Sequence, residues 1–157
     1  EKLGKNYDEN GDFARNGAIN FKILEELNTL TFYQQPAPKS LGVEFVNSVV
    51  FPLLKDETPE NIIATFTEHI AEQIAKVFND NQLKTVLVTG GGTFNTYLLE
   101  KIREKSQTEL IVPDENIINF KEALIFAFMG VLRLRNEVNV LCSATGSSEN
   151  HCSGILV

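Results

Sequence analysis

The sequence predicts an α/β domain that is rich in helix and has a short mixed sheet. Two short apolar runs, at residues 83–89 and 109–113, have the character of strands. Amphipathic stretches with helical spacing lie before, between and after them. Helices followed by strand, helix, strand and helix are the order expected of an α/β protein.

The composition fits one domain, or one lobe of a larger protein. The chain has 157 residues, of which 43% are hydrophobic and 22% charged, so it can bury a core. Its net charge of −7 argues against binding to nucleic acid or to an anionic membrane, and indicates an acidic cytoplasmic protein. The longest apolar run, 123–132, is too short to span a bilayer, and the polar start has no signal-peptide pattern. Because the chain begins with glutamate and two strands make a small sheet, we expect a lobe of a larger protein.

Helix start signals mark three segments in the first half. Asn20 can cap a short helix over 21–28, and Ser40 can begin another that ends before Pro52. Thr58, followed by proline and glutamate, predicts the start of a long amphipathic helix.

One face of this long helix is apolar, and His69 flanks that face. We interpret His69 as a histidine at the boundary of the core, without a chemical role. The apolar face is formed by Ile62, Phe66, Ile70, Ile74, Val77 and Phe78.

The second half is predicted to alternate between strand and helix. The apolar run at 86–88 is continuous, as expected of a strand that is covered on both faces. The next helix opens at Thr93 or Asn95. After the second strand, Asn119 and Glu122 have the spacing of a capping box, which predicts a last helix over 120–135. The small polar residues that follow, 143–154, are expected to form a loop.

No metal site is expected. Cys142, His151 and Cys152 lack a standard zinc spacing, and two cysteines do not make a disulfide scaffold, so we expect free thiols. Residues 8–19 begin like a calcium loop but lack its glycine and its final glutamate, so we expect a hydrogen-bonded turn there.

Three consecutive glycines, residues 90–92, join the first strand to the next helix. Glycine permits a positive φ in a tight turn and lets another molecule approach the main chain without meeting a Cβ. The free amides at the start of the helix favour an anion or a nucleotide phosphate, and such sites lie beyond the carboxyl ends of strands. The pattern is neither a Walker A loop nor the Gly-x-Gly-x-x-Gly fingerprint. A tight turn without a ligand is the alternative interpretation.

Five segments, in the same order, resemble the anhydro-N-acetylmuramic acid kinase family. Residues 86–102, VLVTGGGTFNTYLLEKI, resemble its pattern of strand, three glycines, two residues and asparagine. Residues 7–20, YDENGDFARNGAIN, resemble its Tyr-Asp-x-x-Gly-x-x-Ala-x-x-Gly stretch. Residues 37–47, APKSLGVEFVN, are similar to its Pro-Lys-Ser-Thr-Gly-x-Glu-x-Phe-Asn segment. Residues 121–131 resemble its Glu-Ala-x-x-Phe-Ala helix, and residues 143–147 its closing Thr-Gly.

The resemblance implies that residues 1–157 are the C-terminal lobe of a two-lobed sugar kinase with the ribonuclease H-like fold of actin-like ATPases. Such a kinase is a cytoplasmic enzyme of peptidoglycan recycling. It uses ATP with Mg²⁺ to open 1,6-anhydro-N-acetylmuramic acid with water and to phosphorylate its 6-oxygen. The product is N-acetylmuramic acid 6-phosphate. The implied partners are ATP, the amino sugar and the N-terminal lobe, with a homodimer as a candidate assembly and with neither nucleic acid nor membrane.

The resemblance also implies roles for particular residues. Glu122 falls on a glutamate near the sugar site, with a helix-capping acid as the alternative. Lys39 and Ser40 fall on the Pro-Lys-Ser segment, which implies either a phosphate contact or a structural turn. The implied nucleotide-binding residues are Gly90, Gly91, Gly92 and Asn95.

Four differences separate this sequence from the family pattern. The Gly-Thr-Ser phosphate loop and the Asp-x-Gly-Pro-x-Asn motif that carries the catalytic base are not found in it, so we expect the chain alone to be inactive. Asn119 stands where the family commonly has aspartate, and Leu41 stands for a threonine, which leaves the identity of the sugar open. A related kinase for another sugar and a non-catalytic nucleotide-binding domain are the alternatives.

Overall fold

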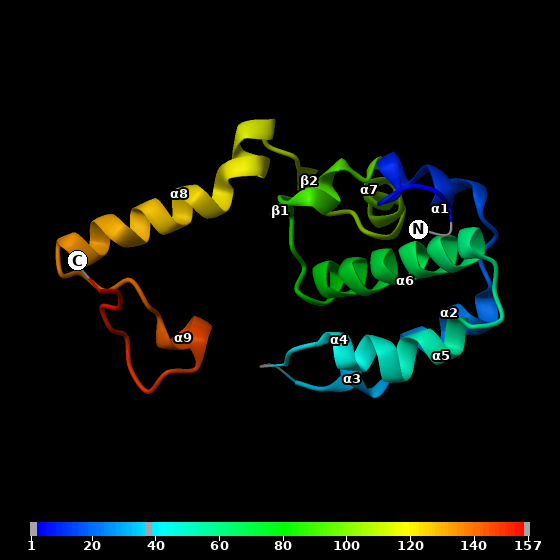
Figure 1. Cartoon of the computed structure of the whole chain (residues 1–157), viewed down its shortest axis with the longest axis horizontal. Coiled ribbons are helices and arrows are strands. Elements are labelled where there is room, and N and C mark those ends of the chain that lie inside the picture. Colours follow the sequence, from blue (N-terminus) through cyan, green and yellow to red (C-terminus); the bar gives the residue numbers. More distant parts are fainter. Residues whose placement is uncertain (1–2, 37–38, 156–157) are drawn as a thin grey trace. The chain divides into compact units, whose positions relative to one another are not determined.

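The computed structural model describes residues 3–36 and 39–155. They fall into two compact units, one up to Val112 and one from Pro113 onward. The first unit holds a small sheet and most of the helices, and the second holds a long helix and the C-terminal segment (Figure 1). Within the described ranges, no helix is both long enough and apolar enough to cross a membrane.

The first unit is built mainly from helices. Its helices α1 to α7 span Asp12–Asn16, Phe21–Asn28, Thr31–Gln34, Val43–Phe45, Phe51–Leu54, Pro59–Asp80 and Thr96–Lys105. Its strands β1 and β2 span Thr85–Leu87 and Glu109–Ile111. Three single turns, η1, η2 and η3, span Glu9–Gly11, Val46–Val50 and Gly91–Phe94.

The long helix α6 is the central element of the first unit. Figure 1 shows α2 and α5 on one side of α6, and α7 with the sheet on the other. Two apolar clusters fill these interfaces, and burial of one such aliphatic side chain contributes about 1.5–3 kcal/mol. The first cluster contains Ile23, Leu27, Val50 and Leu54, and the second contains Ala71, Leu99 and Ile102.

Side-chain caps begin α2 and α6 where the sequence predicts them. The Oδ1 atom of Asn20 accepts a hydrogen bond from the amide of Ile23 at 3.2 Å, and α2 begins there. The hydroxyl of Thr58 accepts from the amide of Asn61, and α6 begins with proline. These two predicted helix starts are confirmed.

The helix predicted to begin at Ser40 and to end before Pro52 is wrong at both ends. It begins at Val43 and continues through the proline to Leu54. A π turn, η2, lies just before Pro52. Proline lacks an amide proton and clashes with the carbonyl four residues earlier, and the wider π turn relieves that clash.

The sheet of the first unit is parallel, so the prediction of a mixed sheet is wrong for it. Thr85 pairs with Glu109 and Leu87 with Ile111, because α7 carries the chain back to the same edge. The expectation that the first strand is covered on both faces is also wrong. Leu87 is 59% exposed and Ile111 is 45% exposed, whereas the side chain of Leu110 packs against the core beneath α7.

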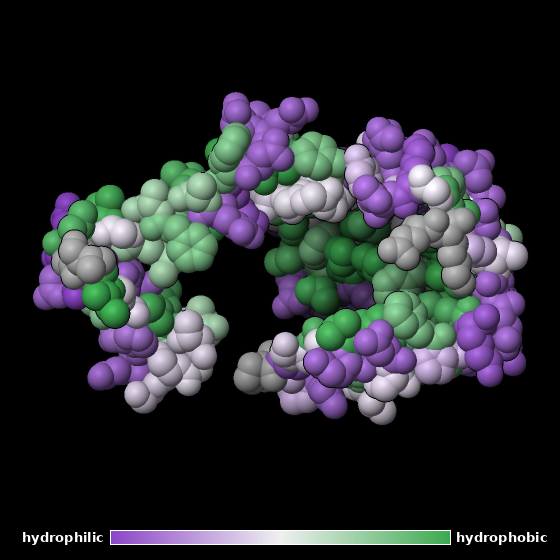
Figure 2. Space-filling model, in the orientation of Figure 1, coloured by the Kyte–Doolittle hydropathy of each residue, from purple (hydrophilic) through white to green (hydrophobic). Residues whose placement is uncertain are grey.

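The second unit is dominated by α8, which spans Glu115–Leu134. The predicted capping box at Asn119 is wrong, because α8 begins five residues earlier. The Asp114 carboxylate caps it and accepts hydrogen bonds from the amides of Asn116 at 2.9 Å and Ile117 at 3.3 Å. Figure 2 shows hydrophobic side chains along α8. Those exposed are Ile117, Phe120, Leu124, Ile125, Phe126, Phe128, Val131 and Leu134.

The C-terminal segment, predicted as a loop, contains some regular structure. A short helix, α9, spans Cys142–Thr145, and Val140 forms an antiparallel bridge with His151. The Nε of Arg133 on α8 donates a hydrogen bond to the carbonyl of Gly154 at 2.8 Å. Both cysteines of the chain have free thiols.

Candidate functional site

The predicted nucleotide-binding glycines form the turn between β1 and α7. Gly90 has φ +83°, in the left-handed region that favours glycine. The amide of Thr93 donates to the carbonyl of Gly90 at 3.0 Å, and the amide of Asn95 donates to that of Gly92 at 3.1 Å. These two bonds make η3 a single tight turn at the carboxyl end of β1.

Gly91 and Gly92 do not need to be glycine for the sake of this turn. Their φ angles lie outside the left-handed region, and a Cβ added to either residue meets no other atom within 4 Å. Both residues are exposed. A tight turn without a ligand therefore explains Gly90 alone. The bare main chain at Gly91 and Gly92 leaves room for another molecule to lie against it.

Asn95, predicted to bind nucleotide, has a structural role in the fold. Its Oδ1 accepts a hydrogen bond from the amide of Leu98 at 2.9 Å, which caps α7. The helix thus opens at Asn95 rather than at Thr93, which lies inside η3. Thr93 is 5% exposed, and its hydroxyl has no hydrogen-bond partner in the described part of the chain. Leaving such a buried hydroxyl unpaired costs about 1–3 kcal/mol.

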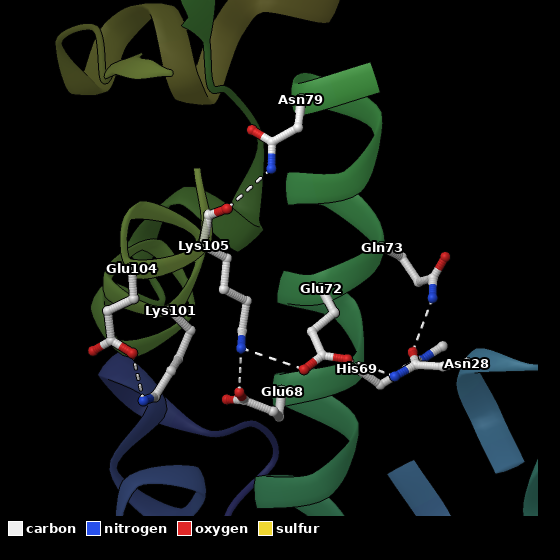
Figure 3. A network of polar contacts seen from close by, with 9 residues as sticks. All are labelled: Asn28, Glu68, His69, Glu72, Gln73, Asn79, Lys101, Glu104 and Lys105. Atoms are coloured by element: carbon white, nitrogen blue, oxygen red, sulfur yellow. Dashed lines mark hydrogen bonds and ion pairs between the residues drawn. The ribbon is translucent and has the colours of Figure 1, made fainter. Parts of the chain in front are cut away.

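A polar network holds α7 against α6 (Figure 3). The Nζ of Lys105, at the end of α7, lies 2.5 Å from the Glu68 carboxylate and 3.3 Å from that of Glu72, both on α6. The Nδ2 of Asn79 donates to the carbonyl of Lys105 at 3.0 Å. Burial by itself lowers the pKa of Lys105, but its bonds to the two carboxylates outweigh burial and raise that pKa. Side chains thus fix α7 at both ends.

His69 is fully buried, so its interpretation as a boundary residue is wrong. Its Nδ1 lies 2.7 Å from the Oδ1 of Asn28, which can only accept, and its Nε2 lies 2.9 Å from the hydroxyl of Tyr33. The Nε2 of Gln73 also donates to that Oδ1, at 2.9 Å. Burial lowers the pKa of His69, more than the nearby Glu72 carboxylate raises it. The ring is therefore a neutral structural group, and no local sequence signal marks it.

Lys39 stabilises a helix end. Its Nζ donates to the carbonyls of Phe32 at 2.9 Å and Tyr33 at 3.4 Å, in the last turn of α3, and lies 4.9 Å from the centre of the Phe32 ring. This geometry favours the structural interpretation of the Pro-Lys-Ser segment. Ser40 beside it is exposed.

Glu122, predicted to bind substrate, lies on α8 in the second unit and is exposed. Because Asp114 caps α8, the alternative interpretation of Glu122 as a capping acid is wrong. The described residues hold no group of three histidine, cysteine or acidic side chains that fits a metal ion.

Two hollows in the first unit lie away from the glycine turn. One, of about 610 Å³, lies between residues 3–13 and the helices α5 and α6. The other, of about 680 Å³, is lined by residues near the amino ends of the strands, among them Lys84 and Arg103. Neither hollow is lined by a residue predicted to bind nucleotide or sugar.

A family model matches this chain along its whole length, and known proteins match most of it. The model of the anhydro-N-acetylmuramic acid kinase family matches residues 1–157. The protein of that name from Francisella tularensis subsp. novicida is 31% identical over 156 residues, which cover 92% of this chain and 41% of the relative. The one from Saccharophagus degradans is 31% identical over 160 residues, which cover 96% and 43%. The one from Haemophilus influenzae is 30% identical over 164 residues, which cover 92% and 43%.

The chain thus spans about two fifths of the length of the curated relatives it matches. The match includes the strand, glycine turn and helix, whose main chain is open at Gly91 and Gly92. From the match along its whole length, we conclude that this chain belongs to the anhydro-N-acetylmuramic acid kinase family.

Proposed function

We propose that the whole gene product that contains this chain is an ATP-dependent kinase of peptidoglycan recycling. It opens the anhydro bond of 1,6-anhydro-N-acetylmuramic acid with water and transfers the γ-phosphoryl group of ATP to the 6-oxygen. The products are N-acetylmuramic acid 6-phosphate and ADP. Membership of the family supports this proposal. The structural observation that carries it is the bare main chain at Gly91 and Gly92.

We place the adenosine side of ATP against this bare main chain. Gly90 supplies the turn, and Gly91 and Gly92 present no side chain to the ligand. Asn95 fixes the start of α7, whose free amides favour the negative charge of a nucleotide. This arrangement positions one substrate, and positioning with charge neutralisation carries most of the catalysis in phosphoryl transfer.

We further propose that this chain is the C-terminal, ribonuclease H-like lobe of the kinase. The match to about two fifths of each relative supports this. So does the absence from this sequence of the family's phosphate loop and of its motif that carries the catalytic base. The remainder of the gene product would supply both. The described residues contain no group of side chains that fits a metal ion. Mg²⁺ would be held by the phosphates of ATP and by carboxylates elsewhere in the gene product. Glu122 is our candidate for a hydrogen bond to the sugar. The proposed location of the protein is the cytoplasm, which supplies ATP.

The proposal is tested by replacing Gly91 in the whole gene product. Gly91→Val places methyl groups where the nucleotide is proposed to lie, so the affinity for ATP should fall tenfold or more, about 1.4 kcal/mol. Because nothing lies within 4 Å of this position, the melting temperature should stay that of the wild type. Calorimetric titration with ATP and sugar-dependent release of ADP are the measurements.

Gln107→Val is the matched control, because it places the same side chain in the exposed loop before β2. It should bind ATP like the wild type. Unchanged affinity in a folded Gly91→Val variant would contradict the nucleotide site. A wild-type protein that binds ATP but releases no ADP with the anhydro sugar would contradict the kinase activity.

A further inference from the structure

We propose that Gly11 is a positioning residue for the nucleotide turn. The proposal rests on the proposed function, because it concerns the affinity of that turn for ATP. Gly11 lies in η1, near the N-terminal end of the described chain, and is buried. It acts on the turn through Asn95, which caps α7 directly after the glycines.

The segment around Gly11 has a defined conformation. The Asp8 carboxylate accepts hydrogen bonds from the amides of Phe13 at 2.8 Å and Ala14 at 3.0 Å, which closes the turn predicted there. Ala14 is fully buried. Gly11 has φ +80°, in the left-handed region, where any other residue is strained. Contacts within this segment therefore fix its backbone independently of its contacts with α7.

The closest contact of Gly11 is with the cap of α7. A Cβ on Gly11 would overlap the Oδ1 of Asn95 and lie 2.6 Å from the Cβ of Tyr97. That Oδ1 is the atom that accepts the amide of Leu98. A side chain at Gly11 must therefore push Asn95 out of its capping position, or move the segment away from α7.

Three further contacts tie the same segment to α7. The hydroxyl of Thr96 donates to the carbonyl of Asn10 at 3.1 Å, across 86 residues of sequence. The guanidinium of Arg15 lies 2.8 Å from the Glu100 carboxylate and 4.7 Å from the centre of the Tyr97 ring. Because the glycine turn runs directly into Asn95, a shift of this cap changes the position of the main chain that ATP is proposed to contact.

The test compares glycine variants in the whole gene product. Gly11→Ala should raise the KM for ATP about fivefold or more, with kcat and the KM for the sugar within about twofold of the wild type. Gly4→Ala controls for backbone strain, since Gly4 has φ +70° with open space around it. Gly17→Ala controls for crowding, since its Cβ would lie 2.7 Å from the carbonyl carbon of Glu60 on α6. Gly17→Ala should lose stability without changing the KM for ATP.

A second variant covers the case in which Gly11→Ala does not fold. Thr96→Val removes the bond to the carbonyl of Asn10 without adding bulk, and should raise the KM for ATP about twofold or more. An unchanged KM for ATP in both folded variants would overturn the proposal, as would an equal rise in the Gly17→Ala control.

Amide hydrogen exchange separates this proposal from the proposed function. Exchange at Leu98 reports the Asn95 cap and needs no nucleotide. Faster exchange at Leu98 in Gly11→Ala, but not in Gly4→Ala, supports the positioning role even if ATP is not the ligand. Unchanged exchange at Leu98 would contradict it, whatever the protein binds.

Discussion

Both ring nitrogens of His69 have hydrogen-bond partners inside the protein. The Nδ1 donates a hydrogen bond to the Oδ1 of Asn28, and the Nε2 accepts one from the hydroxyl of Tyr33. A buried polar group is costly unless it is paired, and this ring is paired on both sides. The same pairing favours the neutral ring, because a charge on it would be far from water.

The pH dependence of stability follows from this burial. The unfolded chain has a histidine pKa of about 6.5, and burial lowers the pKa of His69 in the folded state. The unfolded state therefore binds the proton more readily. The contribution of His69 to the free energy of unfolding is fully present above about pH 6.5 and is lost as the pH falls through that value toward the folded pKa. The free energy of unfolding, measured with urea, should fall between about pH 7.5 and about pH 5.5.

A matched pair of variants assigns this effect to His69. His69→Gln should show a flatter dependence on pH, because no titrating ring is buried. His151→Gln, at an exposed histidine, should keep the wild-type slope. Equal slopes for the wild type and His69→Gln would exclude His69 as the source.

At the level of elements, the start of α8 depends on one carboxylate. Asp114 accepts hydrogen bonds from two amides of the first turn, and its charge also suits the positive end of the helix. Asn119 lies inside the helix and is exposed. The sequence pattern at Asn119 and Glu122 is thus a coincidence of spacing.

The two residues should therefore respond differently to alanine. Asp114→Ala should cost about 1 kcal/mol and speed amide exchange at Asn116 and Ile117, because the cap is lost. Asn119→Ala should change stability by less than about 0.5 kcal/mol. The larger loss at Asn119 would show that α8 begins at the later position.

Elements that depend on short-range bonds were predictable from the sequence. The caps at Asn20, Thr58 and Asn95 bond amides two or three residues ahead, so the pattern that predicts them also contains their partners. The order of strand, glycine turn and helix follows from the same local signals. For the candidate site, the sequence could predict that the three glycines form a turn between the strand and the helix.

Contacts between distant residues were not predictable from local patterns. His69 meets Asn28 across 41 residues, and nothing near either residue indicates the other. The approach of Gly11 to Asn95 likewise depends on how α1 and α7 pack. The helix through Pro52 was missed because a π turn is not visible in a pattern based on α-helical spacing.

At the scale of the whole molecule, α8 is apolar on several sides and exposes large side chains such as Phe120, Phe126 and Phe128. A helix that is apolar all round is typical of one buried inside a larger protein. Together with the match to about two fifths of each relative, this supports our proposal that the chain is one lobe of a larger kinase. The proposed activity therefore belongs to the whole gene product.

A crystal structure of the whole gene product with ADP tests the nucleotide site at the glycine turn most directly. We predict that the adenosine contacts the main chain of Gly91 and Gly92 within about 4 Å, with Asn95 still capping α7. ADP bound at another place, or protein side chains covering Gly91 and Gly92, would contradict a nucleotide site at this turn.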